Sequence, residues 1–468
     1  MVFSSATFLF IFLPAVFLAN LILARFKLRR VQNALLMLAS VLFYAWGEPV
    51  YVLLMLLSTA VNYLLARLHT PEGAARRRRA LTITSVAFNI GMLAFFKYSG
   101  FLVENFNALF GADAPVPGVA LPIGISFYTF QALSYVLDVY RGVAKARRNY
   151  FDVLLYISFF PQLIAGPIVR YGDIAEQIDD REITLDKTAR GLSRFCVGLA
   201  KKVLVANVLG GAADALYALD ALNTPAAWMA ALCYALQIYF DFSGYSDMAI
   251  GLGGVFGFRF RENFNYPYIA QSIQDFWRRW HISLSTWFRE YLYIPLGGNR
   301  KGAARTGINK VIVFFFTGLW HGASWNFVVW GLFHGLFIML ESYRVIKTDS
   351  WPKALRHIYT LLVVVIGFVF FRAETLEAAA GVIAAMFSFN FAGIAGAHLS
   401  TVITPIVACA FAAGCIASAP VASRLAVRGD RGARALEIAK FAAALAVFAL
   451  SVLALSTSAY NPFIYFRF

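Results

Sequence analysis

Apolar segments of about 20 residues follow one another along this 468-residue chain, and each is long enough to cross a lipid bilayer as a helix. Helices are expected because the bilayer core offers no partners for open backbone groups. The sequence therefore predicts one all-α polytopic membrane domain over residues 1–468, with roughly 10 to 12 transmembrane helices. The segments begin near Val2, Val31, Val50, Ala80, Val119, Tyr150, Trp228, Val311, Leu355, Leu399 and Leu436.

The composition narrows the class of protein further. Hydrophobic residues make up 60% of the chain and charged residues 14%, against about a quarter charged in a soluble domain, which excludes an ordinary soluble enzyme. A formal charge of +16 is typical of basic loops on the cytoplasmic side of a membrane. Such a face attracts anionic lipids or an anionic cytosolic substrate, for example a coenzyme A ester. Nucleic acid is the weaker interpretation.

The distribution of basic residues predicts the orientation of the chain. The first apolar segment has no basic region before it and no small-residue cleavage site, which favours a retained span that starts outside. Basic clusters at 25–30, 76–79 and 141–148 then follow odd-numbered spans, as the positive-inside rule requires. We expect the last span, 436–457, to run outward and leave the tail 458–468 outside, because four arginines precede it: Arg424, Arg428, Arg431 and Arg434.

Two segments in the middle of the chain depart from regular alternation. Between Gln274 and Tyr293 the aromatic residues and His281 recur at helical spacing, which predicts an amphipathic helix in the membrane interface. The segment Ile308–Leu340 is apolar but carries glycine and polar residues from Gly318 to Asn326. We expect its helix to break there and to face an internal cavity rather than lipid.

His321, in TGLWHGASWN, is the first candidate for chemistry. Burial at membrane depth disfavours the charged imidazole, so the free base is available to take a proton from a hydroxyl. The alternative is a core histidine bonded to a helix carbonyl, but the glycines and polar residues around His321 favour function. His281 is either a second catalytic group or an aromatic-packed side chain. The remaining histidines have no comparable context and are interpreted as structural: His69, His334, His357 and His398.

Further polar groups are candidates for binding. Asp241 and Asp247 lie within an apolar run, and intramembrane acids are functional or paired more often than idle. Arg259, Arg278 and Arg279 are the candidate ion-pair partners, and a structural role is favoured for Asp247. No metal site or bound cofactor is predicted, since the cysteines form no ligand pattern and are expected to fill the core: Cys196, Cys233, Cys409 and Cys415.

The aromatic C-terminal tail has two interpretations. It is either an anchor in the interfacial aromatic belt, or Tyr465 is an acyl relay, since a phenol with a pKa of about 10 ionises far more readily than a sugar hydroxyl and its ester passes on an acyl group more readily.

At this point the residues resemble a known family, the bacterial alginate O-acetylase branch of the membrane-bound O-acyltransferases. The likeness extends to both ends of the chain, including MVFSSATFLFIFLP and the terminal FIYFRF. Its most specific stretches are YFDFSGYSDMAIGLGGVFGFRFRENFNYPY (239–268), DFWRRWHISLSTWFREYLYIPLGGNR (275–300) and GLWHGASWNFVVWGLFHG (318–335).

The resemblance implies a ring of tilted helices around a central funnel, with a catalytic core at about 119–346. It implies O-acetyl transfer from a cytosolic donor, acetyl-CoA, across the bacterial inner membrane towards an extracytoplasmic polysaccharide, alginate or a related exopolysaccharide. The WHG histidine, His321, is the expected catalytic residue, and His281 is the second family histidine. Tyr465 fits the FxYxxF motif of related systems, from which an extracytoplasmic acetyltransferase partner would take the acetyl group.

We also expect contacts with substrate from Asp241, Tyr245, Trp320, Asn326 and Arg289. Three alternatives remain at this stage. Peptidoglycan is a second candidate acceptor for the same chemistry. A transporter also suits a polytopic chain with buried acids and histidines, although the paired repeats of many transporters are missing from the sequence. A scaffold for polysaccharide secretion would need none of the histidines.

Overall fold

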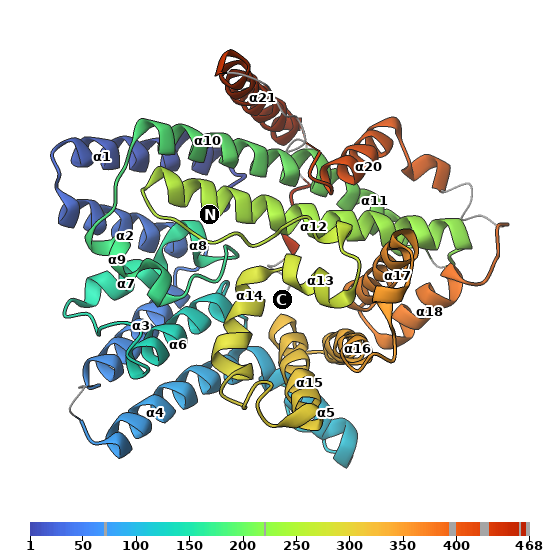
Figure 1. Ribbon diagram of the computed structural model, residues 1–468, viewed down its shortest axis with the longest axis horizontal. Coiled ribbons are helices and arrows are strands. Elements are labelled where there is room, and N and C mark those ends of the chain that lie inside the picture. Colours follow the sequence, from blue (N-terminus) through green and yellow to red (C-terminus); the bar gives the residue numbers. More distant parts are fainter. Residues whose placement is uncertain (70–72, 220, 393–398, 422–429, 458–459, 465–468) are drawn as a thin grey trace. The chain divides into compact units, whose positions relative to one another are not determined.

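A computed structural model describes residues 1–69, 73–219, 221–392, 399–421, 430–457 and 460–464. Throughout these ranges the regular secondary structure is helical, with no strand (Figure 1). The predicted all-α class is therefore confirmed. The described chain divides into two compact units, Met1–Phe195 with Met248–Arg261, and Cys196–Asp247 with the residues from Glu262 onward.

The first unit is built from short and medium helices. Aromatic rings pack at its core, where the ring of Phe43 lies 5.8 Å from that of Phe8 and 5.6 Å from that of Phe160. Its elements are η1 (Phe8–Phe12), α1 (Leu13–Arg25), α2 (Arg29–Ala45), α3 (Tyr51–Arg67), α4 (Ala75–Leu93), η2 (Ala94–Tyr98), α5 (Ser99–Phe110), α6 (Ile125–Tyr140), α7 (Tyr150–Ser158), α8 (Phe160–Leu163), α9 (Tyr171–Asp179) and most of α10 (Leu185–Ala200).

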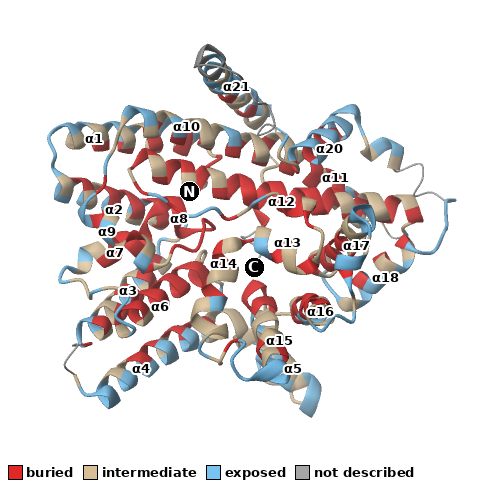
Figure 2. Cartoon of the chain, viewed as in Figure 1, coloured by how far each residue is buried: buried red, intermediate tan, exposed pale blue. Residues whose placement is uncertain are grey.

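The second unit contains every residue of the candidate site. The long helix α12 (Thr224–Val255) enters it, and buried residues run along most of that helix (Figure 2). The other elements are η3 (Lys201–Ala206), α11 (Asn207–Tyr217), η4 (Pro267–Ile269), α13 (Ile273–Arg279), α14 (Ile282–Phe288), η5 (Arg289–Tyr293), α15 (Gly302–His321), α16 (Trp325–Ser342), η6 (Thr348–Ser350), α17 (Lys353–Arg372), α18 (Leu376–Met386), α20 (Pro405–Ala417) and α21 (Asp430–Thr457).

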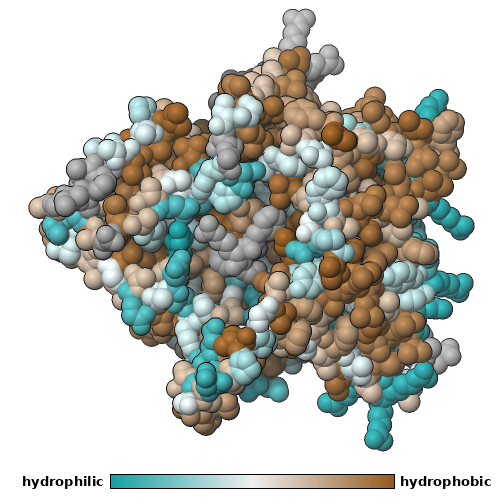
Figure 3. Space-filling model, turned by 180° about the vertical axis from the view of Figure 1, so that it is seen from behind, coloured by the Kyte–Doolittle hydropathy of each residue, from teal (hydrophilic) through white to brown (hydrophobic). Residues whose placement is uncertain are grey.

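Five helices or helix runs in the described residues are long and apolar enough to cross a membrane: Phe8–Arg25, Ala75–Phe110, Leu185–Tyr217, Lys353–Arg372 and Ala435–Thr457. Hydrophobic side chains cover much of the face seen in Figure 3, and large ones such as Leu42 and Leu53 are about two-thirds exposed, as expected for a surface in contact with lipid. The count of 10 to 12 crossings and the funnel remain predictions.

Three local expectations are wrong. The apolar run from Tyr150 is not one span. The helix α7 ends at Ser158, and a separate short helix, α8, starts at Phe160 with Pro161 in its first turn. The span Leu185–Tyr217 was missed. Of the four cysteines, Cys233 is buried, Cys196 is partly exposed, and Cys409 and Cys415 are exposed.

The helix α15 ends at the residue where the sequence predicted a break. Gly322 is extended, with φ −169°, and a Cβ on it would lie 2.1 Å from the ring of Phe327. The chain resumes as α16 at Trp325. The two helices pack backbone to backbone, since a Cβ on Gly318 would lie 2.2 Å from the carbonyl oxygen of Phe327. The predicted break is confirmed.

The amphipathic helix expected between Gln274 and Tyr293 is two short helices instead. The backbone breaks at His281, whose φ of 43° is in the left-handed region, an uncommon conformation for a non-glycine residue. Two main-chain hydrogen bonds fix this break. The N–H of Ile282 donates to the carbonyl oxygen of Asn263 (2.9 Å), and the N–H of Asn265 donates to the carbonyl oxygen of Arg279 (2.9 Å). The seven-residue helices α13 and α14 are too short to cross a bilayer.

Candidate active site

Two histidines meet around one tryptophan in the second unit. His321 is the last residue of α15 and is 2% exposed, while His281 is fully buried. The ring of Trp320 lies 4.9 Å from the ring of His321 and 5.7 Å from that of His281. The two imidazoles therefore lie against one indole ring, and Trp320 is the side chain that joins them.

The tautomer of His281 follows from its neighbours. The backbone N–H of Ser283 donates to Oδ1 of Asn263 (3.2 Å), which shows that this atom of Asn263 is the oxygen. Nδ1 of His281 lies 3.1 Å from the same oxygen, so Nδ1 carries the proton and donates. Nε2 then keeps its lone pair, and it has no hydrogen-bond partner among the described residues. Burial lowers the pKa of His281 because desolvation disfavours the charged ring.

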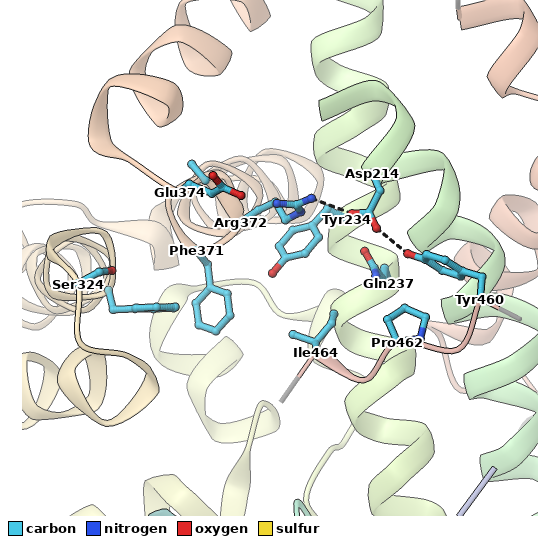
Figure 4. A pocket seen from close by; sticks show the side chains of 12 residues that line it. Asp214, Tyr234, Gln237, Ser324, Phe371, Arg372, Glu374, Tyr460, Pro462 and Ile464 are labelled. Carbon is cyan, nitrogen blue, oxygen red and sulfur yellow. Dashed lines mark hydrogen bonds and ion pairs between the residues drawn. The ribbon is translucent and has the colours of Figure 1, made fainter. Parts of the chain in front are cut away.

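Aromatic rings enclose His321. The rings of Trp330 and Phe371 lie 5.0 and 5.1 Å from its imidazole. Phe371 also lines a cavity of about 380 Å³ that is bordered by residues of α11, α12, α17 and the C-terminal segment (Figure 4). One wall of the histidine centre is therefore also a wall of this cavity, which we call the tail cavity.

A second cavity, of about 320 Å³, is lined by residues of α13, α14, η5, α15 and α16. Three cations line it, Arg278, Arg289 and Lys310, together with apolar residues that include Trp277. The ring of Trp277 lies 5.7 Å from that of Trp330, which in turn contacts His321. A cavity that combines positive charge with aromatic walls suits an anionic ligand with an apolar part. We call it the basic cavity.

Comparison with known proteins gives the family. The model of the MBOAT, membrane-bound O-acyltransferase, family matches residues 143–376. A protein named probable alginate O-acetylase AlgI from Azotobacter vinelandii is 43% identical, with 100% of both chains covered. A peptidoglycan O-acetyltransferase from Helicobacter pylori is 38% identical over 86% of this chain and 82% of its own. A teichoic acid D-alanyltransferase from Bacillus subtilis is 27% identical over 54% of this chain and 69% of its own.

This chain belongs to the membrane-bound O-acyltransferase family. It is an O-acyltransferase, and its multi-pass membrane character agrees with the apolar helices described above.

The other expected binding residues of this O-acyltransferase lie in three places. Asp241 and Tyr245 contact the chain's own C-terminal segment, since Oδ2 of Asp241 accepts the N–H of Ile464 (2.9 Å) and the ring of Tyr245 lies 4.8 Å from that of Phe463. Asn326 donates to the carbonyl oxygen of Ala373 (2.6 Å). Arg289 faces the basic cavity with a side chain that is 70% exposed.

Sequence reasoning missed the ion-pair partners in this unit. Asp241 pairs with Lys202 (2.6 Å), not with an arginine, and Asp247 pairs with Lys201 (2.6 Å). The two lysines lie inside the overlooked span Leu185–Tyr217, where intramembrane charge was a usable signal. Asn263, which orients His281, was also missed.

Tyr465, Arg424 and Arg428 lie outside the described residues.

Proposed function

We propose that this O-acyltransferase moves acetyl groups from acetyl-CoA in the cytosol across the bacterial inner membrane, for O-acetylation of an extracytoplasmic polysaccharide. The observation that carries the proposal is the convergence of two buried histidines on Trp320 in a chain of this family. Alginate or a related exopolysaccharide is the proposed acceptor, because full-length relatives at 41 to 43% identity are named for alginate.

The proposed reaction needs a base next to a thioester. An imidazole takes the proton of the acceptor hydroxyl, the oxygen attacks the acetyl carbonyl, and the C–S bond breaks to release the thiol, which receives a proton. His321 is proposed as the base, with His281 assisting it. The unprotonated Nε2 of His281 supports this role, because Asn263 leaves it as an acceptor in a buried site.

The basic cavity supports an anionic donor. Coenzyme A carries phosphates that Arg278, Arg289 and Lys310 would attract, and its pantetheine arm would pass the apolar walls towards Trp277. From there the edge-to-face contacts of Trp277 with Trp330, and of Trp330 with His321, connect the wall of the cavity to the histidine centre. We propose that this cavity opens to the cytoplasmic side, and that both chain termini lie outside.

Tyr465 is proposed to carry the acetyl group on the outer side until an extracytoplasmic acetyltransferase partner takes it. The described residue before it, Ile464, borders the tail cavity together with Phe371, which supports access from that cavity to the histidine centre. Replacement Tyr465→Phe removes only the hydroxyl. We expect it to abolish polysaccharide acetylation, and full acetylation would refute the relay.

The central test is His321→Ala, assayed as polysaccharide acetylation in cells at equal membrane abundance. We expect a loss of about 100-fold or more, the range for a positioned acid–base group, while His357→Ala, outside the centre, serves as the matched control. Purified protein should also release thiol from acetyl-CoA in a manner that depends on His321. An intact thioester would favour the transporter, and silent histidine variants would favour the scaffold.

The acceptor can be decided separately. The Helicobacter relative is named for peptidoglycan, so peptidoglycan remains the alternative acceptor for the same chemistry. Mass analysis of acetyl groups on both polymers, in cells with the wild-type protein and with His321→Ala, distinguishes them.

A further inference from the structure

The C-terminal segment 460–464 is held inside the second unit rather than at its surface. Phe463 and Ile464 are 8% and 7% exposed. The side-chain amide of Asn207 on α11 donates to the carbonyl oxygen of Tyr460 (3.3 Å) and to Oδ1 of Asn461 (3.2 Å). These residues therefore pack among helices, which does not fit an anchor in the interfacial aromatic belt.

A buried ion pair holds the backbone of this segment. Lys202 and Asp241 lie 2.6 Å apart with side chains 6% and 1% exposed. Nζ of Lys202 also donates to the carbonyl oxygen of Pro462, and Oδ2 of Asp241 accepts the N–H of Ile464. A buried ion pair is costly unless further hydrogen bonds satisfy its members. Here the backbone of segment 460–464 supplies one hydrogen bond to each of the two charged side chains.

A second attachment fixes the start of the segment. The hydroxyl of Tyr460 donates to Oδ2 of Asp214 (2.7 Å), and Arg372 binds Oδ1 of the same carboxylate (2.7 Å) (Figure 4). Gly210 leaves room beside this contact, because a Cβ there would lie 2.5 Å from Nε2 of Gln237 and 3.1 Å from the hydroxyl of Tyr460. With attachments at Tyr460 and at Pro462–Ile464, the segment is unable to slide along the helices without breaking both.

The attachments end one residue before the proposed relay tyrosine. Ile464 borders the tail cavity with Phe371, whose ring lies 5.1 Å from that of His321. The docked segment therefore ends beside the tail cavity.

We infer that Lys202 and Asp241 are positioning residues that set the register of the C-terminal segment 460–464 against α11 and α12, so that the segment always ends at the same point beside the tail cavity. The inference rests on the proposed function in one respect, because its register test takes Tyr465 as the acyl carrier. The docking itself is independent of that role, and the experiments separate the two.

Docking is tested without measuring activity. Asn207→Cys with Asn461→Cys, in a full chain whose four native cysteines are replaced by alanine, should be joined by a short bifunctional thiol reagent, as read by mass spectrometry. Adding Lys202→Met and Asp241→Asn together should sharply reduce the linking. Removing both charges avoids an unpaired buried ion, so this variant should still fold. Undiminished linking would overturn the role of the ion pair.

Register is tested by two single-alanine insertions that leave the ion pair intact. An insertion after Thr457 lies upstream of both attachments, so the segment still docks and acetyl transfer should persist. The same insertion after Ile464 displaces Tyr465 and should reduce transfer about 100-fold, the cost of a small misplacement. Equal loss in both chains would overturn the register model. If linking depends on the ion pair but Tyr465→Phe retains transfer, the relay fails while docking stands.

Discussion

The orientation of His281 is set by a residue 18 positions earlier in the chain. Asn263 accepts from Nδ1 of His281 and from the N–H and hydroxyl of Ser283, and it donates to the hydroxyl of Ser246 (3.0 Å). One amide therefore fixes the ring, its tautomer and the strained backbone beside it. In the proposed mechanism Asn263 would orient the imidazole, as the third member of a catalytic triad does.

We expect Asn263→Leu to reduce acetyl transfer strongly, because it removes the acceptor that holds the Nδ1 proton. It should also lower stability by about 1–3 kcal/mol, since it leaves buried donors unpaired. Asn263→Asp keeps the acceptor oxygen and should retain more transfer than the leucine variant. Initial rates and thermal unfolding in detergent would measure both effects, and equal rates for the two variants would contradict the tautomer role.

For single residues, the sequence was sufficient to place His321 and Trp320 at a break in an apolar helix, because glycine and polar residues interrupt the run there. The catalytic roles of His321 and His281 remain predictions. The sequence was insufficient for Asn263, Asp214 and Arg372. Their partners are distant in the chain, and only folding brings them together. The sequence correctly marked Asp241 as an acid within an apolar run, but its ion-pair partner is Lys202 and not one of the arginines proposed.

The helices α15 and α16 place His321 through close glycine contacts. A Cβ on Gly331 would lie 2.3 Å from the carbonyl oxygen of Phe314 and 3.1 Å from the Cα of Gly318. Backbone atoms are unable to move aside as a flexible side chain would. The angle at which α15 delivers His321 therefore depends on both glycines.

For Gly331→Ala we expect a loss of stability of about 1–3 kcal/mol from overpacking, together with reduced transfer. Gly381→Ala on α18 is the control, because nothing lies within 4 Å of a Cβ at that position. Unfolding midpoints of the two variants would be compared in the same detergent. A Gly331 variant as stable as the control would show that the interface adapts.

The start of α13 is capped from another helix. Glu341 of α16 accepts the N–H groups of Ile273 (2.7 Å) and Gln274 (3.0 Å), which are orphan donors at a helix N-terminus. Tyr359 of α17 donates to the same carboxylate (3.2 Å). The helix that leads to His281 is thus fastened to the helices that flank His321.

Replacing Glu341 with alanine leaves the buried N–H of Ile273 and the partly buried N–H of Gln274 without an acceptor, at about 1–3 kcal/mol for a fully buried group. We expect Glu341→Ala to lower both stability and acetyl transfer. Glu341→Gln keeps an acceptor oxygen, so its stability and its transfer should lie between those of the alanine variant and the wild type. Hydrogen exchange of α13 amides is the direct measurement. Unchanged exchange in the alanine variant would refute the capping role.

At the scale of elements, the apolar runs predicted the all-helical class and the break near Gly322 correctly. Helical periodicity failed at His281, because side chains on both sides of that break happen to continue the same helical spacing. A left-handed residue leaves no mark on such a pattern. The span Leu185–Tyr217 was hidden by its own charges, which find their partners only in the folded protein.

For the whole molecule, the orientation in the membrane is the main prediction. We expect Arg77 on the cytoplasmic side and Asp113 outside, at opposite ends of the helix run Ala75–Phe110. Both residues are exposed. In cysteine-free protein, Asp113→Cys should react with an impermeant maleimide in intact spheroplasts, whereas Arg77→Cys should react only after permeabilisation. The reverse pattern would invert the proposed direction of transfer.

The docked segment 460–464 also has a consequence for biosynthesis. It is the part of the described chain that leaves the ribosome last, yet Lys202 and Asp241, made more than 200 residues earlier, depend on it for hydrogen bonds. Helices inserted by the translocon therefore lack these two hydrogen bonds until residues 460–464 have been made. A chain that stops before residue 460 lacks both bonds, so truncation changes the interior of the second unit as well as the length of the chain.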